Sequence, residues 1–341
     1  MSSYEPVFLF SRRGLLVPFE KRYSDIEETV AILEARGLTV PDQTRAGRCL
    51  GRIGYYRLSA YWYPFRIPSG DIGATGRLDT FREGASFDDV IAFYLFDKAL
   101  RLHLGDALER IEIAVRAHLV EILGKIEPCS YRDRRSYTGR FNEVADGTVG
   151  SDETPLAAFI DGLDRTFERS QEEFAKHFRT TYEGPPPVWI AIGTWDWGKL
   201  SHAINHLSDR NRDALARSID PRLTKKALVS WIRCLNEVRN TCAHHSRLWN
   251  KPLINSPRLQ PREIGDFAHM ADDAGKVPDA RGKRLYGALM TMIFLMRAFY
   301  PNTTWPDRLG TLISNADLPA EVDLASAGFP PDWRDDPIWA L

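Results

Sequence analysis

The stretch Leu108-Glu-Arg-Ile-Glu-Ile-Ala-Val-Arg116 lies in the longest helix that the chain predicts, which runs from Phe87 to about Leu123. Ser86 precedes this segment as a favourable N-cap residue. Apolar residues recur along it at helical spacing, namely Ile91, Leu95, Leu102, Leu108, Ile111, Val115 and Leu119. The segment therefore predicts a long helix with an apolar stripe that faces a core.

Further segments with helical patterning lie on both sides of this helix. We expect helices over residues 24–35, 44–61, 156–182, 188–207, 209–218, 222–248 and 281–299. Ser24-Asp-Ile-Glu27 is typical of a capping box at the start of the first. Residues 64–84 predict a loop in which short strands can occur, 128–155 a connector, and the tail from Asp317 an irregular segment.

These segments together predict an all-α fold. We expect an N-terminal helical region over 1–84, a helical core over 85–255 that contains the inserted connector 128–155, and a C-terminal helix with an irregular acidic tail over 256–341.

Composition limits the kinds of partner. The chain has 341 residues and a net charge of −1, so no global basic field attracts nucleic acid and any polyanion site must be local. The four cysteines have no zinc-site spacing, and the longest apolar run, Ala288 to Met296, is too short to span a bilayer. The N-terminus has no secretory pattern. We predict a cytoplasmic protein with no metal, no cofactor and no membrane partner.

The 222–248 helix has two different faces. At about 100° per residue, its apolar residues fall within one arc of roughly 80° and form a core stripe: Leu228, Trp231, Leu235, Val238 and Cys242. The polar residues on the opposite side are Arg233, Glu237, Asn240 and His244. Arg239 lies on the border, His245 leans towards the stripe, and Arg247 and Lys251 add positive charge just beyond.

Arg239, Asn240 and His244 are the candidate catalytic residues. The planar guanidinium matches a phosphate, histidine gives and takes protons near neutral pH, and the amide can orient either group. A histidine near a helix end is also typical of a structural cap, and the spacing from Arg239 to His244 occurs by chance in many proteins. Both interpretations therefore stay open on the residues alone.

Three other groups allow two interpretations. Glu109, Glu112 and Arg116 share a helix face, which is either solvated or lines a cleft opposite Arg239. The segment Tyr131 to Arg140 mixes Arg and Tyr, so it is either a solvated loop or a grip for RNA backbone and bases. The aromatic cluster Tyr55, Tyr56, Tyr61, Trp62 and Tyr63 favours packing over a stacking platform.

Several blocks of the chain resemble the Abi-like family of bacterial abortive-infection proteins. The most specific is Arg239-Asn-Thr-Cys-Ala-His-His-Ser-Arg-Leu-Trp-Asn250. Ile53 to Trp62, Phe96 to Arg101 with Leu108 to Arg116, and Pro186 to Trp189 with Trp197 to Ser201 resemble other blocks in the same order. The third block departs from the family pattern around Thr194 to Gly198: an acidic residue and a Phe-Gly step are usual there, and Trp197 is an aromatic substitute for the Phe. The resemblance spans roughly residues 20–255.

That family is similar to the HEPN superfamily of helical proteins, many of which are metal-independent endoribonucleases. The resemblance implies an HEPN-like helical bundle and assigns the superfamily motif to Arg239, Asn240 and His244. It also implies that two copies of the motif meet in a homodimer. Ser246 stands where a related branch has a tyrosine that an antidote enzyme modifies, so we do not expect that control.

The predicted function is therefore RNA cleavage by an antiphage effector or toxin. Supporting or RNA-binding roles are predicted for Glu109, Glu112, Arg116, His245, Arg247 and Lys251. The expected partners are RNA, as substrate or as a bound non-coding RNA, a second copy of the chain, and an antitoxin. The alternatives are a non-catalytic RNA-binding sensor or scaffold of the same fold, and a protein-interaction module in which Arg239 and His244 form a structural pair.

Overall fold

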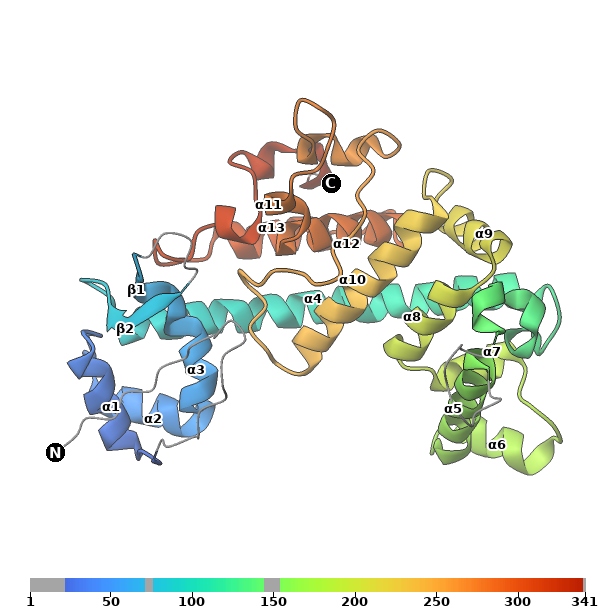
Figure 1. Ribbon diagram of the computed structural model, residues 1–341, viewed down its shortest axis with the longest axis horizontal. Helices are drawn as coiled ribbons and strands as arrows, with labels where there is room; N and C mark the ends of the chain where they lie inside the picture. Colours follow the sequence, from blue (N-terminus) through green and yellow to red (C-terminus); the bar gives the residue numbers. More distant parts are fainter. Residues whose placement is uncertain (1–21, 71–75, 144–153, 340–341) are drawn as a thin grey trace. The chain divides into compact units, whose positions relative to one another are not determined.

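The computed structural model describes residues 22–70, 76–143 and 154–339, and these are mostly helical with one two-stranded hairpin (Figure 1). The all-α fold class is therefore confirmed. The chain forms two compact units: one comprises Met1–Ala99 with Ala316–Asp323, and the other comprises Leu100–Asn315 with Leu324–Leu341. The functional division at residues 84 and 255 stays a prediction.

The N-terminal unit contains α1 (Ile26–Ala35), α2 (Gln43–Ile53), α3 (Tyr55–Trp62) and the antiparallel strands β1 (Arg66–Pro68) and β2 (Arg77–Phe81). The capping box of α1 uses Asp25 and Glu28, one residue later than predicted. The single helix expected over 44–61 is wrong, because Gly54 adopts φ +89° and separates α2 from α3. Such a φ favours glycine, which has no Cβ to clash.

Two buried aromatic side chains of the predicted cluster, Tyr61 and Trp62, stabilise this unit. Tyr61 and Trp62 are at most 1% exposed, and the Tyr61 hydroxyl donates a hydrogen bond of 2.8 Å to the buried Asp97 carboxylate. The packing prediction is wrong for Tyr56 and Tyr63, which are 66% and 36% exposed, and Tyr55 is only partly buried. Asp97 lies on α4 (Phe87–Gly124), the long helix, which belongs to this unit up to Ala99 and to the second unit from Leu100.

The apolar stripe of α4 is narrower than predicted. Leu108, Ile111, Val115 and Leu119 are at most 1% exposed, but Leu95 and Leu102 are 52% and 68% exposed. At about 100° per residue, those two leucines lie roughly 140° and 120° around the helix from Leu108, so they cannot share its face. Leu100 and Leu104, both fully buried, occupy the core positions instead.

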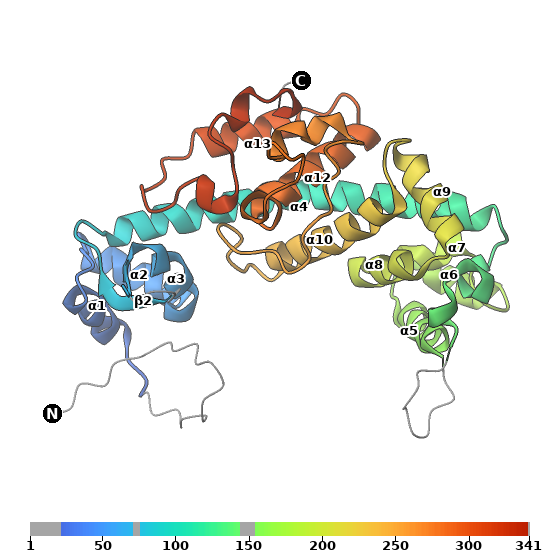
Figure 2. The ribbon, with the colours of Figure 1, turned by 45° about the horizontal axis from the view of Figure 1, so that its top comes forward.

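The second unit is built from the remaining helices. They are α5 (Pro155–Arg169), α6 (Glu173–Thr181), α7 (Val188–Ala191), α8 (Trp197–His206), α9 (Asp209–Ile219), α10 (Lys225–Ala243), α11 (Asp279–Gly282), α12 (Leu285–Phe299) and α13 (Trp305–Ser314). The helix α10 packs against α8, α9 and α12, and both ribbon views show it next to α8 and α12 (Figures 1 and 2).

Two helix predictions in this unit are wrong, and one helix was not predicted. The helix expected over 156–182 is two helices, because the chain is extended at Ser170 and Glu172. The helix expected over 188–207 breaks at Trp195 and Asp196, where Asp196 caps the start of α8. The helix α13 was not expected; it begins at Trp305 with Pro306 in its first turn, a position that tolerates a residue without an N–H.

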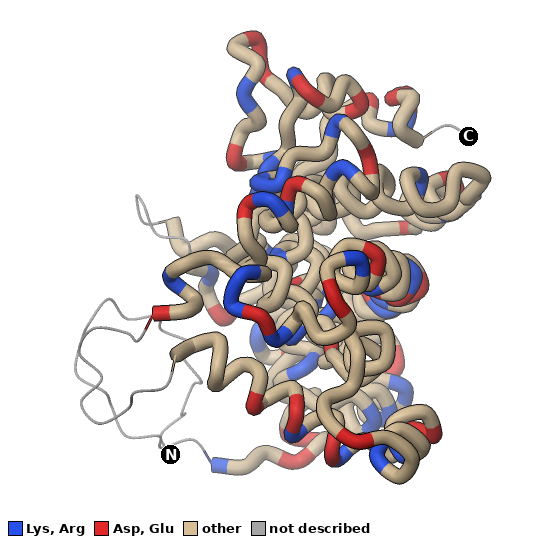
Figure 3. Tube along the Cα trace, turned by 90° about the vertical axis from the view of Figure 1, so that its right-hand side faces the viewer, with Lys and Arg blue, Asp and Glu red and all other residues tan. Residues whose placement is uncertain are grey.

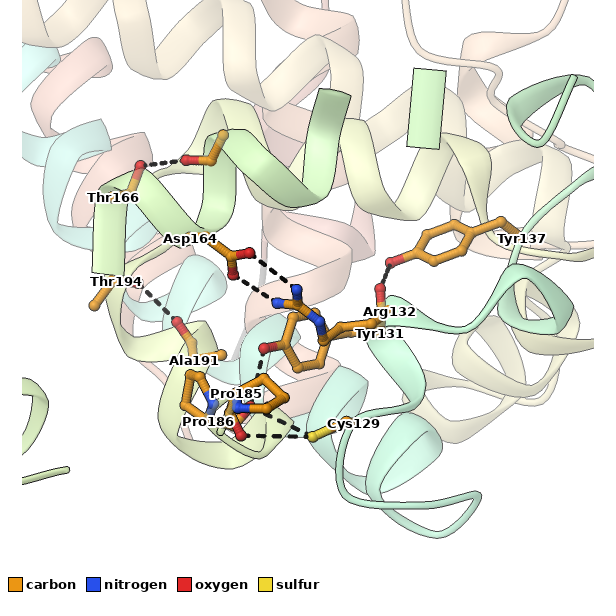
Figure 4. A network of polar contacts seen from close by, with 11 residues as sticks. Cys129, Tyr131, Arg132, Tyr137, Asp164, Thr166, Pro185, Pro186, Ala191 and Thr194 are labelled. Carbon is orange, nitrogen blue, oxygen red and sulfur yellow. Dashed lines mark hydrogen bonds and ion pairs between the residues drawn. The ribbon is translucent and has the colours of Figure 1, made fainter. Parts of the chain in front are cut away.

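The described part of the connector is packed rather than solvated (Figure 4). Tyr131 and Tyr137 are at most 4% exposed; Tyr131 donates to the Pro186 carbonyl at 2.9 Å and Tyr137 to the Tyr131 carbonyl at 2.7 Å. Arg132 forms two hydrogen bonds of 2.6 and 2.9 Å with Asp164. Both interpretations of this loop are therefore wrong for its tyrosines, which hold the connector to the helices. Residues 144–153 of the connector lie outside the described residues.

The C-terminal tail is irregular, as predicted, but its aromatic side chains are buried. Phe329, Trp333 and Trp339 are at most 5% exposed. Phe329 and Trp339 pack against Tyr286 on α12, and Trp333 packs against both of them. The Phe329 ring also stacks on Trp249, with centroids 5.6 Å apart. The tail therefore contacts the segment that follows α10.

Candidate active site

The helix α10 carries the candidate residues, and its apolar stripe holds it in the core. Leu228, Trp231, Leu235 and Val238 are at most 1% exposed, as predicted, whereas Cys242 is only partly buried. The Thr224 hydroxyl caps the helix by accepting from the Ala227 N–H at 3.2 Å. The buried stripe fixes the rotation of α10, and the polar residues near its C-terminus therefore have defined directions.

The helix ends in a Schellman motif centred on two histidines. His244 is the C-cap residue, and His245 adopts a left-handed φ of +57°. The His245 N–H donates to the Cys242 carbonyl at 3.0 Å, and the Ser246 N–H donates to the Thr241 carbonyl at 2.9 Å. The helix predicted to reach residue 248 thus ends at Ala243.

His245 consequently does not lean towards the core, and that prediction is wrong. Its side chain is exposed, as is that of His244. A helical projection applies only while the backbone stays helical, and the left-handed residue turns the chain away.

The segment after the motif is held against the protein. The Glu237 carboxylate accepts hydrogen bonds from the backbone N–H groups of Ile254 (3.0 Å) and Asn255 (2.8 Å). Arg101, which is 6% exposed, donates to the Ser246 carbonyl at 3.3 Å. Glu237 and Arg101 therefore position this segment, and neither was among the predicted site residues. Two sequence signals pointed to Arg101: it lies in a block that carries the family resemblance, and helix spacing placed it one to two turns before the face formed by Glu109, Glu112 and Arg116.

An open depression of about 380 Å³ lies between the end of α10 and this segment. It brings together three predicted site residues, Asn240, His244 and Lys251, with the carboxylate of Glu237. His244 and Lys251 are exposed, so both can reach a ligand from solvent.

Arg239 points elsewhere. Its side chain is not part of the lining of this depression, but its Nη1 donates to Asn240 Oδ1 at 3.3 Å. Asn240 thus connects the arginine to the depression that contains His244. Arg247 is partly buried. The structure thus joins Asn240 to Arg239 by a hydrogen bond and places Asn240 with His244 in the lining of one depression.

Two carboxylates lie within electrostatic range of Arg239. Burial raises the pKa of Glu112, and the nearby charges of Arg116 and Arg239 oppose that rise. Burial also opposes ionisation of Asp196, but hydrogen bonds from Lys199 and the charges of Lys199 and Arg239 lower the pKa of Asp196. Asp196 was not predicted, although an aspartate three residues before a lysine at a helix start is a recognisable N-cap.

Glu112 and Arg116 form a partly buried pair, so the solvated interpretation is wrong for them. Their side chains are 14% and 23% exposed, and Arg116 Nη2 donates to both Glu112 Oε1 and the Trp195 carbonyl. Glu109 on the same helix is exposed. Of the predicted face, Glu112 lies within electrostatic range of Arg239 and pairs with Arg116, and Glu109 is exposed.

Basic and acidic residues are interspersed along the described trace (Figure 3). Within residues 22–70, 76–143 and 154–339, no three His, Cys, Asp or Glu side chains gather as a metal site would require. In the same part of the chain, no helix is long and apolar enough to cross a membrane.

The fold and site define a helical protein with an Arg-Asn pair and a histidine at the exposed end of a buried helix. The chain belongs to the Abi-like protein family, whose model matches residues 48–250. The resemblance to this family is thereby confirmed, and it suggests a role in abortive-infection defence against phage. No curated protein and no solved structure matches the chain.

Proposed function

We propose that this protein is an abortive-infection effector that cleaves RNA without a metal ion. The observation that carries this proposal is the position of Asn240. Its side chain accepts a hydrogen bond from Arg239 and lines the same open depression as His244 and Lys251. A phosphate bound there meets the Asn240 amide, the Lys251 ammonium and the His244 imidazole, and the amide links this site to the Arg239 guanidinium.

RNA supplies the nucleophile for this reaction. In the proposed step, the 2′-oxygen bonds to the adjacent phosphorus while the bond from phosphorus to the 5′-oxygen breaks. A base removes the 2′-hydroxyl proton and an acid protonates the leaving 5′-oxygen, which gives a 2′,3′-cyclic phosphate and a 5′-hydroxyl. We assign proton transfer to His244, stabilisation of the phosphoryl oxygens to Arg239, and orientation to Asn240.

Acid and base are two roles, and each chain offers one histidine, His244, in the depression. We therefore propose a homodimer in which the His244 of a second copy supplies the other role. Similarity to the HEPN superfamily supports this arrangement. The exposure of His244 at an open depression also supports it, because a second chain can approach there. Light scattering tests the proposal, and a fully active monomer at assay concentration would contradict it.

One observation favours the rival function, a protein-interaction module with a structural arginine. Arg239 is partly buried and lies near Glu112 and Asp196, as an arginine that holds helices together would. The two functions predict different effects for the loss of His244. This exposed side chain adds little to packing, so its loss should abolish cleavage by a nuclease and leave a protein-interaction module largely unchanged.

The test compares the unmodified chain with His244→Ala, both in cells and as purified protein in excess EDTA. We expect the unmodified chain to produce new RNA ends with 2′,3′-cyclic phosphates and 5′-hydroxyls, and His244→Ala to produce none. His177→Ala is the matched control, because His177 is another exposed histidine, on α6. A strict requirement for a divalent metal, 3′-hydroxyl products, or equal activity of His244→Ala would refute the proposal.

A further inference from the structure

A second hollow, of about 490 Å³, opens beside Arg116. Its walls come from the C-terminal part of α4, from α7 and from the turn that follows α7, and they include Ala117, Val120 and Ile192. This volume falls within the range of about 300–1,000 Å³ that is typical of small-molecule pockets. The hollow lies wholly in the second unit and is separate from the depression at the end of α10.

Trp189 makes this hollow unusual. Of the nine tryptophans, the other eight are at most 5% exposed, whereas Trp189 is 51% exposed and lines the hollow. Its indole is also well supported. A Cβ at Gly124 would lie 3.6 Å from Trp189 Cε3, and the neighbouring Val188 is fully buried, with its N–H donating to the Pro128 carbonyl at 2.7 Å. The exposed ring is therefore held in place before any ligand arrives.

The polar groups of the hollow suit the edge of a flat ligand. Arg116 Nε is buried and finds no hydrogen-bond acceptor among the described residues. The His118 ring lies beside it, with Nδ1 3.0 Å from Ser218 Oγ, and burial lowers the pKa of His118, which keeps the ring neutral at pH 7. Glu121 at the rim forms an ion pair of 3.0 Å with Lys125, which offsets its charge.

Arg116 also connects the hollow to the candidate active site. Its Nη2 donates to Glu112, and Glu112 lies within electrostatic range of Arg239. A ligand that occupies both places must combine a phosphate with a flat ring further along the same molecule. Single-stranded RNA has this chemistry, and a base–aromatic stack tolerates any of the four bases.

We propose that the hollow is a nucleobase subsite, in which Trp189 stacks on a base of single-stranded RNA whose phosphate backbone passes Arg239. This inference deepens the proposed function and rests on RNA being the substrate. It assigns to Trp189 a binding role and no part in proton transfer.

The experiment measures binding in a His244→Ala background, where cleavage is not a factor. The probe is a fluorescein-labelled single-stranded 12-mer of adenosine. We expect Trp189→Ala to weaken binding roughly tenfold, since loss of one base stack has an effect of this order. Trp189→Phe keeps a ring and should recover most of the affinity. Tyr182→Ala, which removes another exposed aromatic (57%) outside the hollow, should bind as the parent does.

Acrylamide quenching gives an independent readout, because the eight buried tryptophans are shielded from the quencher. We expect the RNA to protect the fluorescence of the parent and to leave that of Trp189→Phe unchanged. Unaltered affinity of Trp189→Ala, no RNA binding by the parent, or equal protection by adenosine monophosphate alone would overturn the inference.

The outcomes separate this inference from the proposed function. Trp189-dependent binding by a protein that never cleaves RNA would leave the subsite standing and refute the nuclease. Cleavage that depends on His244 and not on Trp189 would refute the subsite alone.

Discussion

Substitutions of the two adjacent histidines at the end of α10 should have separate effects, one on RNA cleavage and the other on the free energy of unfolding. His244→Ala removes an exposed side chain and opens no cavity, so the free energy of unfolding should change by less than about 1 kcal/mol while RNA cleavage is lost. His245→Gly acts on the backbone instead. His245 holds φ at +57°, a conformation that costs a residue with a Cβ about 1–2 kcal/mol and costs glycine almost nothing.

The net gain from His245→Gly is smaller than that strain. Glycine makes the unfolded chain more flexible, which offsets part of the relief, so we expect the free energy of unfolding to rise by about 0.5–1 kcal/mol. For a unit of this size, each kcal/mol shifts the melting temperature by roughly 2–4 °C. Cleavage per folded molecule should be largely retained.

Urea denaturation followed by circular dichroism, paired with an RNA-cleavage assay on the same samples, measures both quantities. A His245→Gly protein that is less stable than the parent would refute the Schellman argument, because the side chain would then contribute more than the strain. A folded His244→Ala protein that still cleaves RNA would refute the assignment of His244.

Three further changes test the surroundings of the site. Arg239→Lys keeps the charge but loses the planar fork, so cleavage should fall by about a hundredfold, with Arg239→Ala at least as impaired, in an RNA-end assay. Burial raises the pKa of Glu112, so its charged form destabilises the folded state at pH 7, and this cost disappears only as the pH falls through that pKa. Glu112→Gln should therefore be at least as stable as the parent at pH 7 in urea denaturation. Burial, and to a lesser extent the charges of His202 and Arg212, lower the pKa of His206 from 6.5 to about 4. The free energy of unfolding should therefore fall as the pH drops from about 6.5 to about 4. Solvent screening reduces that loss to about 1–2 kcal/mol, and His206→Asn should remove it.

The sequence predicted the two long helices, α4 and α10, because their buried apolar residues recur at helical spacing over many turns. The periodicity of α10 identified four of its buried residues, and the bounds of α4 were predicted to within one residue. The errors came from single positions with strong local geometry. Gly54 breaks a helix through a left-handed φ, and His245 does the same at a residue type that helical projection treats as ordinary.

The remaining errors concern partners that lie far away in the sequence. Tyr131 is buried because Pro186, 55 residues later, accepts its hydrogen bond. The surroundings of Arg239 likewise combine Glu112 from α4 with Asp196 from α8. No local pattern specifies such pairings, because they form only when the helices pack. The sequence therefore predicted candidate residues and could not show which carboxylates lie near Arg239.

The charges of Glu112 and Asp196 decide whether Arg239 has positive charge left to bind a phosphate. Glu112 is engaged by Arg116, and Asp196 is engaged by Lys199 at its helix start. Each carboxylate thus has a cation of its own, and Arg239 adds a third positive charge to two negative ones. Glu109, the other acidic residue that affects Glu112, is exposed, and solvent screens its charge. The cluster keeps an excess of one positive charge, which one phosphodiester, with its single negative charge, would neutralise.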